Sequence, residues 1–153
     1  EDGVRTQVGM WLKENASSPD DTVLLECLGY IGFFSGLKMY DYPGMATPKT
    51  VAARKKLRDK HGPYGTWTEI SNEQKIALIR EMKPDWIALR VSTANSIDQK
   101  DRNILRKEYE AQLEVSNSDR IREIPGLPGH MYLEIDATFV IFARSEKSLS
   151  EQP

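Results

Sequence analysis

Two acidic side chains stand where α/β proteins often bind a ligand. Glu26 and Asp41 each fall at the carboxyl end of a segment typical of a strand, residues 22–26 and 38–42. Open α/β sheets bind ligands at the carboxyl edge of their parallel strands. Carboxylates there could bind a sugar or another polar ligand, and Tyr30 could add a ring for stacking. We therefore predict Glu26, Tyr30 and Asp41 as candidate ligand-binding residues.

The same three residues also have a structural interpretation. A carboxylate just after a strand commonly accepts hydrogen bonds from the backbone amides of the next segment. An aromatic residue beside glycines commonly packs against a neighbouring element. The sequence leaves both interpretations open and does not say whether Glu26 and Asp41 are close in space.

A glycine run follows the first predicted strand, with glycines at 29, 32 and 36. Dinucleotide-binding proteins carry G-x-G-x-x-G at this turn, so that backbone amides can approach a pyrophosphate. Here the turn is Glu26-Cys27-Leu28-Gly29, and a carboxylate would repel phosphate. The glycines instead favour close packing of a short helix on the sheet, with Gly36 ending that helix in a left-handed cap.

No catalytic set or metal site is predicted from the remaining reactive residues. The two histidines, His61 and His130, lie in loop-forming sequence and lack the spacing of a helical zinc pair. The single cysteine, Cys27, has no basic neighbour to activate it and is typical of a small buried residue. We expect no cofactor.

Composition narrows the class of protein. The 153 residues suit one domain, and 21 basic against 23 acidic residues give no field that would attract nucleic acid. No apolar run approaches the roughly 20 residues of a membrane span. The sequence starts at Glu1 without a signal peptide, which we interpret as a piece of a longer protein.

The elements that must position the candidate residues alternate between helix and strand. Helices are predicted over residues 2–15, 48–57 and 71–82, with Ser71 as cap and Gln74 completing a capping box. Strands are predicted over 22–26, 38–42 and 85–91. This order predicts an α/β fold with parallel strands, a three-layer, Rossmann-like sheet.

The last third of the chain has weaker patterns. Residues 95–108 are predicted as partly helical, 109–115 as an edge strand and 117–129 as loop. Residues 131–144 predict either a long bent strand with a bulge or two strands, lying antiparallel on the sheet. The prediction is thus one mostly parallel domain over 1–144 with an antiparallel C-terminal strand or hairpin. A disordered polar tail is expected over 145–153.

The series VGMWLKENASSPDDTVLLECLGYIGFFSGLKMYDYPGMATPKTVAARKK carries a pattern of short motifs. They are a helix ending in WLKEN, a PDDTV strand, the run ECLGYIGFFSG, a strand ending in Asp41, and the turn GMATP. Two later segments, KPDWIAL at residues 83–89 and FVIFAR at residues 139–144, belong to the same pattern. This pattern resembles the soluble segment that follows the last membrane span of bacterial multi-span glycosyltransferases of the mannosyltransferase-like, lipid-linked-sugar class.

The resemblance implies a non-catalytic, extracytoplasmic (periplasmic) C-terminal domain, because such transferases place their catalytic acidic residues in loops between membrane helices. Its partners would be the membrane-spanning part of the same polypeptide and a lipid-linked sugar, with no nucleic acid. The domain would either help seat the donor or acceptor or only stabilise the membrane part. The alternative is a free-standing α/β module that binds a sugar or nucleotide. A small hydrolase or transferase in its own right has the least support from the residues.

Overall fold

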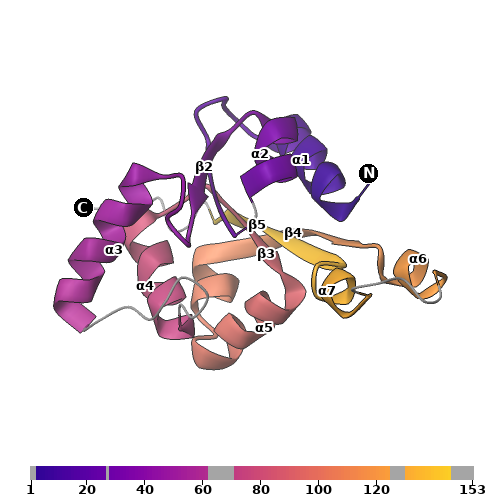
Figure 1. Ribbon diagram of the computed structural model, residues 1–153. Helices are drawn as coiled ribbons and strands as arrows, with labels where there is room; N and C mark the ends of the chain where they lie inside the picture. The colour runs from indigo at the N-terminus through magenta and orange to yellow at the C-terminus, as the bar shows by residue number, and fades with distance from the viewer. Residues whose placement is uncertain (1–2, 27, 62–70, 125–129, 146–153) are drawn as a thin grey trace.

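The computed structural model describes residues 3–26, 28–61, 71–124 and 130–145 (Figure 1). The described residues form a sheet in the order β2-β1-β3-β5-β4. Its strands are β1 (Thr22–Leu25), β2 (Lys38–Asp41), β3 (Trp86–Arg90), β4 (Tyr109–Ser116) and β5 (Thr138–Arg144). β1 pairs in parallel with both β2 and β3, whereas β5 pairs antiparallel with both β3 and β4. The sheet is therefore parallel at one edge and antiparallel at the other, and the predicted antiparallel C-terminal strand is confirmed.

The helices lie on both faces of this sheet. They are α1 (Val4–Asn15), α2 (Leu28–Ser35), α3 (Pro48–His61), α4 (Asn72–Met82), α5 (Val91–Lys100), a short π-helix η1 (Ile104–Glu108), α6 (Ser118–Arg122) and α7 (His130–Ile135). Figure 1 shows α1 and α2 together above the sheet, α4 and α5 below it, and α3 at the left beside α4. Among the described residues, no helix is long and apolar enough to cross a membrane.

Alternating side chains of the central strands build two separate cores. Val23 and Leu25 pack with α1 and α2, while Leu24 between them packs with α4 and α5 on the other face. Ile87 and Leu89 of β3 join Leu24, and the remaining buried residues of β3 face α1. Strands buried on both faces are expected where helices cover both sides of a sheet. This explains the continuous apolar runs in the sequence.

Hydrogen bonds between Thr22, the first residue of β1, and Asp85, just before β3, hold these two strands together at their amino ends. The Asp85 carboxylate accepts hydrogen bonds from the Thr22 backbone amide (2.9 Å) and hydroxyl (2.7 Å), and the Asp85 amide donates back to the Thr22 hydroxyl (3.1 Å). Arg144 of β5 donates to the other Asp85 oxygen at 3.0 Å. These bonds satisfy polar groups that the sheet would otherwise leave unpaired at its end.

Two predictions that depend only on neighbouring residues in the sequence, the helix cap at Ser71 and the left-handed glycine at 36, are confirmed. Ser71 caps α4, and Gln74 completes the capping box with both reciprocal hydrogen bonds. Gly36 has φ +67, the predicted left-handed conformation after α2. The helix predicted within 95–108 begins earlier than expected, at Val91, directly after β3.

The strand predicted at 131–135 is wrong, because these residues form helix α7. β4 ends at Ser116, which pairs with Thr138 at the start of β5, so β4 offers no partner to residues 131–135. A backbone without a neighbouring strand satisfies its hydrogen bonds locally, as a helix does. The loop predicted at 117–129 likewise contains α6. The proposed tail lies outside the described residues from 146 onward.

The glycine that permits close packing of α1 and α2 is Gly9, which the sequence analysis did not single out. A Cβ on Gly9 would lie 2.9 Å from the Ile31 carbonyl oxygen and 2.9 Å from the Phe34 Cβ. Gly29, by contrast, has no atom of another described residue within 4 Å of such a Cβ, its chain neighbours and its own helix apart. The packing role predicted for the glycine run therefore does not hold for Gly29.

Gly9→Ala is expected to lower the free energy of unfolding by about 1–3 kcal/mol, because the added methyl forces α1 away from α2. Gly29→Ala is the matched control and should raise it by up to about 1 kcal/mol, since alanine favours the helix and meets no neighbour. Urea denaturation followed by circular dichroism measures both. Equal effects from the two substitutions would contradict this account of the contact.

Candidate functional site

Glu26 lies directly after β1, at the carboxyl edge of the parallel strands, as predicted. Its carboxylate accepts a hydrogen bond from the Tyr42 hydroxyl at 2.7 Å and forms an ion pair with Arg90, the last residue of β3. The Glu26 side chain keeps 34% of its surface exposed, whereas Arg90 keeps 18%. The two neighbouring parallel strands, β1 and β3, are thus joined through side chains at their carboxyl ends.

Arg90 holds a second carboxylate, Asp136, which lies just before β5. Asp136 also pairs with Arg5 of α1. The result is an alternating chain of charges, Glu26–Arg90–Asp136–Arg5, which we call the ion-pair chain. It connects β1, β3, the start of β5 and α1. Two arginines balance two carboxylates, so the chain carries no net charge of its own.

Lys75 of α4 lies beside this chain. Its ammonium is 5.6 Å from the centre of the Tyr42 ring. Burial lowers the pKa of Lys75, and the charge of Glu26 opposes that shift. None of the described carboxylates lies within ion-pair distance of Lys75, so its charge is compensated less well than those of Arg5 and Arg90.

Asp41 is fully buried at the end of β2 and has a structural role there. One of its oxygens accepts hydrogen bonds from the backbone amides of Met45 and Ala46, and the Asp41 amide donates to Thr47. These contacts shape the turn after β2, in which Gly44 has φ +76. The other oxygen, Oδ1, is buried and has no hydrogen-bond partner among the described residues.

Tyr30 lies on α2, apart from Asp41, with its ring stacked on Phe34 at 6.3 Å between centroids. It lines a groove that also contains Arg5 and Asp136, so it borders the far end of the ion-pair chain. The structure therefore places Glu26 at the carboxyl edge, Tyr30 in a neighbouring groove and Asp41 in the turn after β2. Among the described residues, no hydrogen bond or ion pair connects Glu26 with Asp41.

The sequence analysis missed the basic half of this site. Arg90 could have been found, because it ends a predicted strand at the same edge as Glu26. Arg5, Lys75 and Asp136 carry no local signal, since only the strand order and helix packing bring them here. In the described part of the chain, no cluster of His, Cys, Asp or Glu side chains is suited to hold a metal ion.

The fold and this edge define an α/β domain with a mixed sheet and a neutral ion-pair chain at the carboxyl end of its parallel strands. Residues 1–141 match the model of a family described as a domain of unknown function, DUF8728. The chain belongs to that family. Comparison with curated proteins gave no match, and comparison with solved structures gave none either.

Arg90→Gln is expected to lower the free energy of unfolding by about 1–3 kcal/mol, because it leaves the partly shielded carboxylate of Glu26 without its arginine and Asp136 with Arg5 alone. The control is Arg80→Gln, at a more exposed arginine that pairs with Asp101 at 2.6 Å. Its expected cost is below about 1 kcal/mol.

A double-mutant cycle with Glu26→Gln isolates the contribution of the pair itself. A favourable coupling between positions 26 and 90 is expected from denaturation midpoints. A coupling energy near zero would show that the ion-pair chain does not hold β1 to β3.

Proposed function

We propose that this chain is a non-catalytic accessory domain of a membrane-embedded glycosyltransferase, lying on the extracytoplasmic (periplasmic) side of the membrane. The observation that supports a non-catalytic role is that both acidic residues at the carboxyl edge of the parallel strands are bound to other groups of the protein. Glu26 is bound to Arg90 and Tyr42, and Asp41 is bound to the turn after β2. Side chains committed in this way stabilise a fold and are poorly placed to donate or accept protons in a reaction.

The motif resemblance supports the glycosyltransferase part of this proposal. The strand order β2-β1-β3, with helices on both faces, also supports a Rossmann-like arrangement for the parallel half of the sheet. In the proposed protein the partners are the membrane-spanning part of the same polypeptide and a lipid-linked sugar. The domain either helps to seat the sugar donor or acceptor, or stabilises the membrane part alone.

The sequence of the complete gene product gives the first test. We expect several hydrophobic spans, each of about 20 residues, immediately before residue 1. A complete product with no such spans would contradict the proposal.

Glu26→Gln in the complete protein gives the second test, on sugar transfer from a lipid-linked donor in isolated membranes. Removal of a general acid or base costs roughly 10²–10⁴-fold in rate. Because we place Glu26 outside the chemistry, the expected loss is less than about tenfold. The protein level in the membrane is the control, and a loss of 10²-fold or more at an unchanged level would make Glu26 catalytic.

Lys75 favours a second candidate function, the binding of a small anionic ligand such as a sugar phosphate or a nucleotide. Its half-buried ammonium lies by Tyr42 with no described carboxylate in ion-pair contact. A phosphate there would gain a cation that is already partly desolvated.

Thermal-shift titration with glucose 1-phosphate and uridine monophosphate tests this candidate, with uncharged glucose as the reference. Ligand binding should raise the melting temperature in a saturable way. Lys75→Met should weaken the response, whereas Lys56→Met, at a surface lysine paired with Glu81, should not. No shift with either phosphate, or an equal shift with glucose, would exclude an anion site at Lys75.

A further inference from the structure

A pocket lies at the amino end of the parallel strands, opposite the end that carries Glu26. Its volume is about 1030 Å³, close to the upper end of the roughly 300–1,000 Å³ found for small-molecule sites. The end of α1, the connection to β1, η1 and β4 contribute to its walls. We name it the amino-edge pocket, and its lining includes Asn15, Asp21, Trp86, Arg106, Glu110 and Ala143. None of the candidate residues Glu26, Tyr30 and Asp41 lines it.

The floor of the amino-edge pocket is a row of side chains across three strands. Trp86 of β3 pairs with Ala143 of β5, and Ala143 pairs with Glu110 of β4, so the three side chains lie on one face of the sheet. α1 packs on this face and ends at Asn15, which lines the pocket. The Ala143 side chain is short beside those of Trp86 and Glu110, which leaves the sheet surface hollow between them.

Asp21 is a fixed hydrogen-bond acceptor in the lining of the pocket. One of its oxygens, Oδ2, accepts hydrogen bonds from the Trp86 indole (3.0 Å) and from the Ser17 backbone amide (3.0 Å). No described residue donates to its other oxygen, Oδ1. A carboxylate held in this way can accept a hydrogen bond from a ligand with little further loss of side-chain freedom.

Arg106 is a donor that is fixed by a second pair of contacts. Its Nε and Nη2 donate to the two oxygens of Asp98 at 2.7 and 2.5 Å, and no described residue accepts from its Nη1. Arg106 belongs to η1, and π-helical turns are rare and frequently lie at functional sites. The side chains of Lys107 and Glu110 have no hydrogen-bond or ion-pair partner among the described residues. The lining therefore offers donors and acceptors that the described protein does not itself use.

The charges of the lining cancel. Three carboxylates and three cations line the pocket, namely Asp21, Asp85, Glu110, Arg106, Lys107 and Arg144. A charged ligand would thus gain no net attraction over an uncharged one. A largely apolar ligand is also disfavoured, because sites for such ligands have mainly apolar linings. Hydroxyl groups both donate and accept hydrogen bonds, so a ligand rich in hydroxyls suits a lining that offers both.

We propose that the amino-edge pocket binds an uncharged saccharide. The hydroxyl groups of the sugar accept a hydrogen bond from Arg106 and donate to Asp21 and Glu110, and the C–H groups of its ring lie over Ala143. This inference deepens the proposed function and rests on it only for identifying the saccharide as the sugar of the donor or acceptor. The described chain supplies all of these binding groups, so free sugars can test the site.

Titration of the isotope-labelled chain with maltose, cellobiose and mannobiose, followed by two-dimensional NMR, tests the proposal. The indole N–H of Trp86 is the reporter at the pocket, because it is bonded to Asp21. We expect at least one disaccharide to shift this signal saturably, with a dissociation constant that does not change with salt concentration. No saturable shift with any of these sugars, or shifts confined to Tyr42 and Lys75 at the carboxyl edge, would overturn the proposal.

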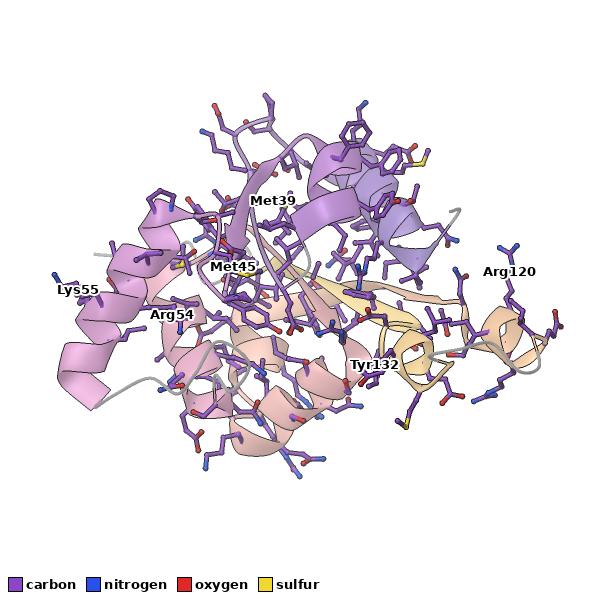
Figure 2. The ribbon with its side chains drawn as sticks, in the orientation of Figure 1. Met39, Met45, Arg54, Lys55, Arg120 and Tyr132 are labelled. Atoms are coloured by element: carbon purple, nitrogen blue, oxygen red, sulfur yellow. The ribbon has the colours of Figure 1, made fainter. Side chains whose placement is uncertain are left out.

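Matched substitutions assign the binding to the pocket. Glu110→Ala with Gln112→Ala, both in its lining, should raise the dissociation constant at least about fivefold through lost hydrogen bonds. Glu114→Ala, on the same strand but outside the lining, should leave it unchanged. Lys107→Met should also weaken binding, whereas Lys55→Met should not, and Figure 2 shows Lys55 projecting outward from α3. Circular dichroism confirms that each variant is folded, and an equal effect of Glu114→Ala would contradict the assignment.

Further outcomes separate this proposal from its alternatives. A saturable shift of the Trp86 signal with the zwitterionic peptide trialanine, and none with the sugars, would assign the pocket to peptides and overturn the proposal. Hydrophobic spans before residue 1 with no sugar binding would refute the saccharide site and leave the proposed function standing. Sugar binding at the pocket of a protein that lacks such spans would support the site and refute the proposed function.

Discussion

The parallel pairing of β1 with β3 is the constraint on which the rest of this domain depends. Asp85 and Thr22 tie the two strands together at their amino ends, and Glu26 and Arg90 do so at their carboxyl ends. Between these ties the strands bury side chains on both faces, so each strand takes part in both cores. A shift of one residue in their register would exchange the two sets of apolar side chains and separate both polar ties.

The ion-pair chain extends this constraint to the helical layer above the sheet. Arg90 reaches Asp136 before β5, and Asp136 reaches Arg5 on α1, so the first helix is anchored to the sheet by charge as well as by packing. The close approach of α1 to α2 at Gly9 adds a second constraint on the same layer. The N-terminal helix is therefore an integral part of the domain.

The sequence allowed the parallel half of the fold to be predicted, because its signals are local. Apolar runs marked β1, β2 and β3, and Ser71 with Gln74 marked the start of α4. The helix at 130–135 could not be recognised, since MYLEI fits a strand as well as a helix and only the end of β4 at Ser116 decides between them. Glu26 was placed at the correct edge, but its partner Arg90 became visible only when the strand order was known. Packing glycines depend on a neighbour, which explains why Gly9 was overlooked and Gly29 was overrated.

The outer edge of β4 limits how this domain can assemble. β4 is an edge strand whose exposed residues include Glu110, Gln112 and Glu114, and its register with β5 shifts between Ala111 and Leu113. Acidic side chains and a bulge on an edge discourage a further strand from adding to the sheet. Growth of the sheet into fibrils, or capture of an extended peptide as a sixth strand, is thus disfavoured on this side. Contacts with another protein at this edge are therefore expected to use helices in place of strand pairing.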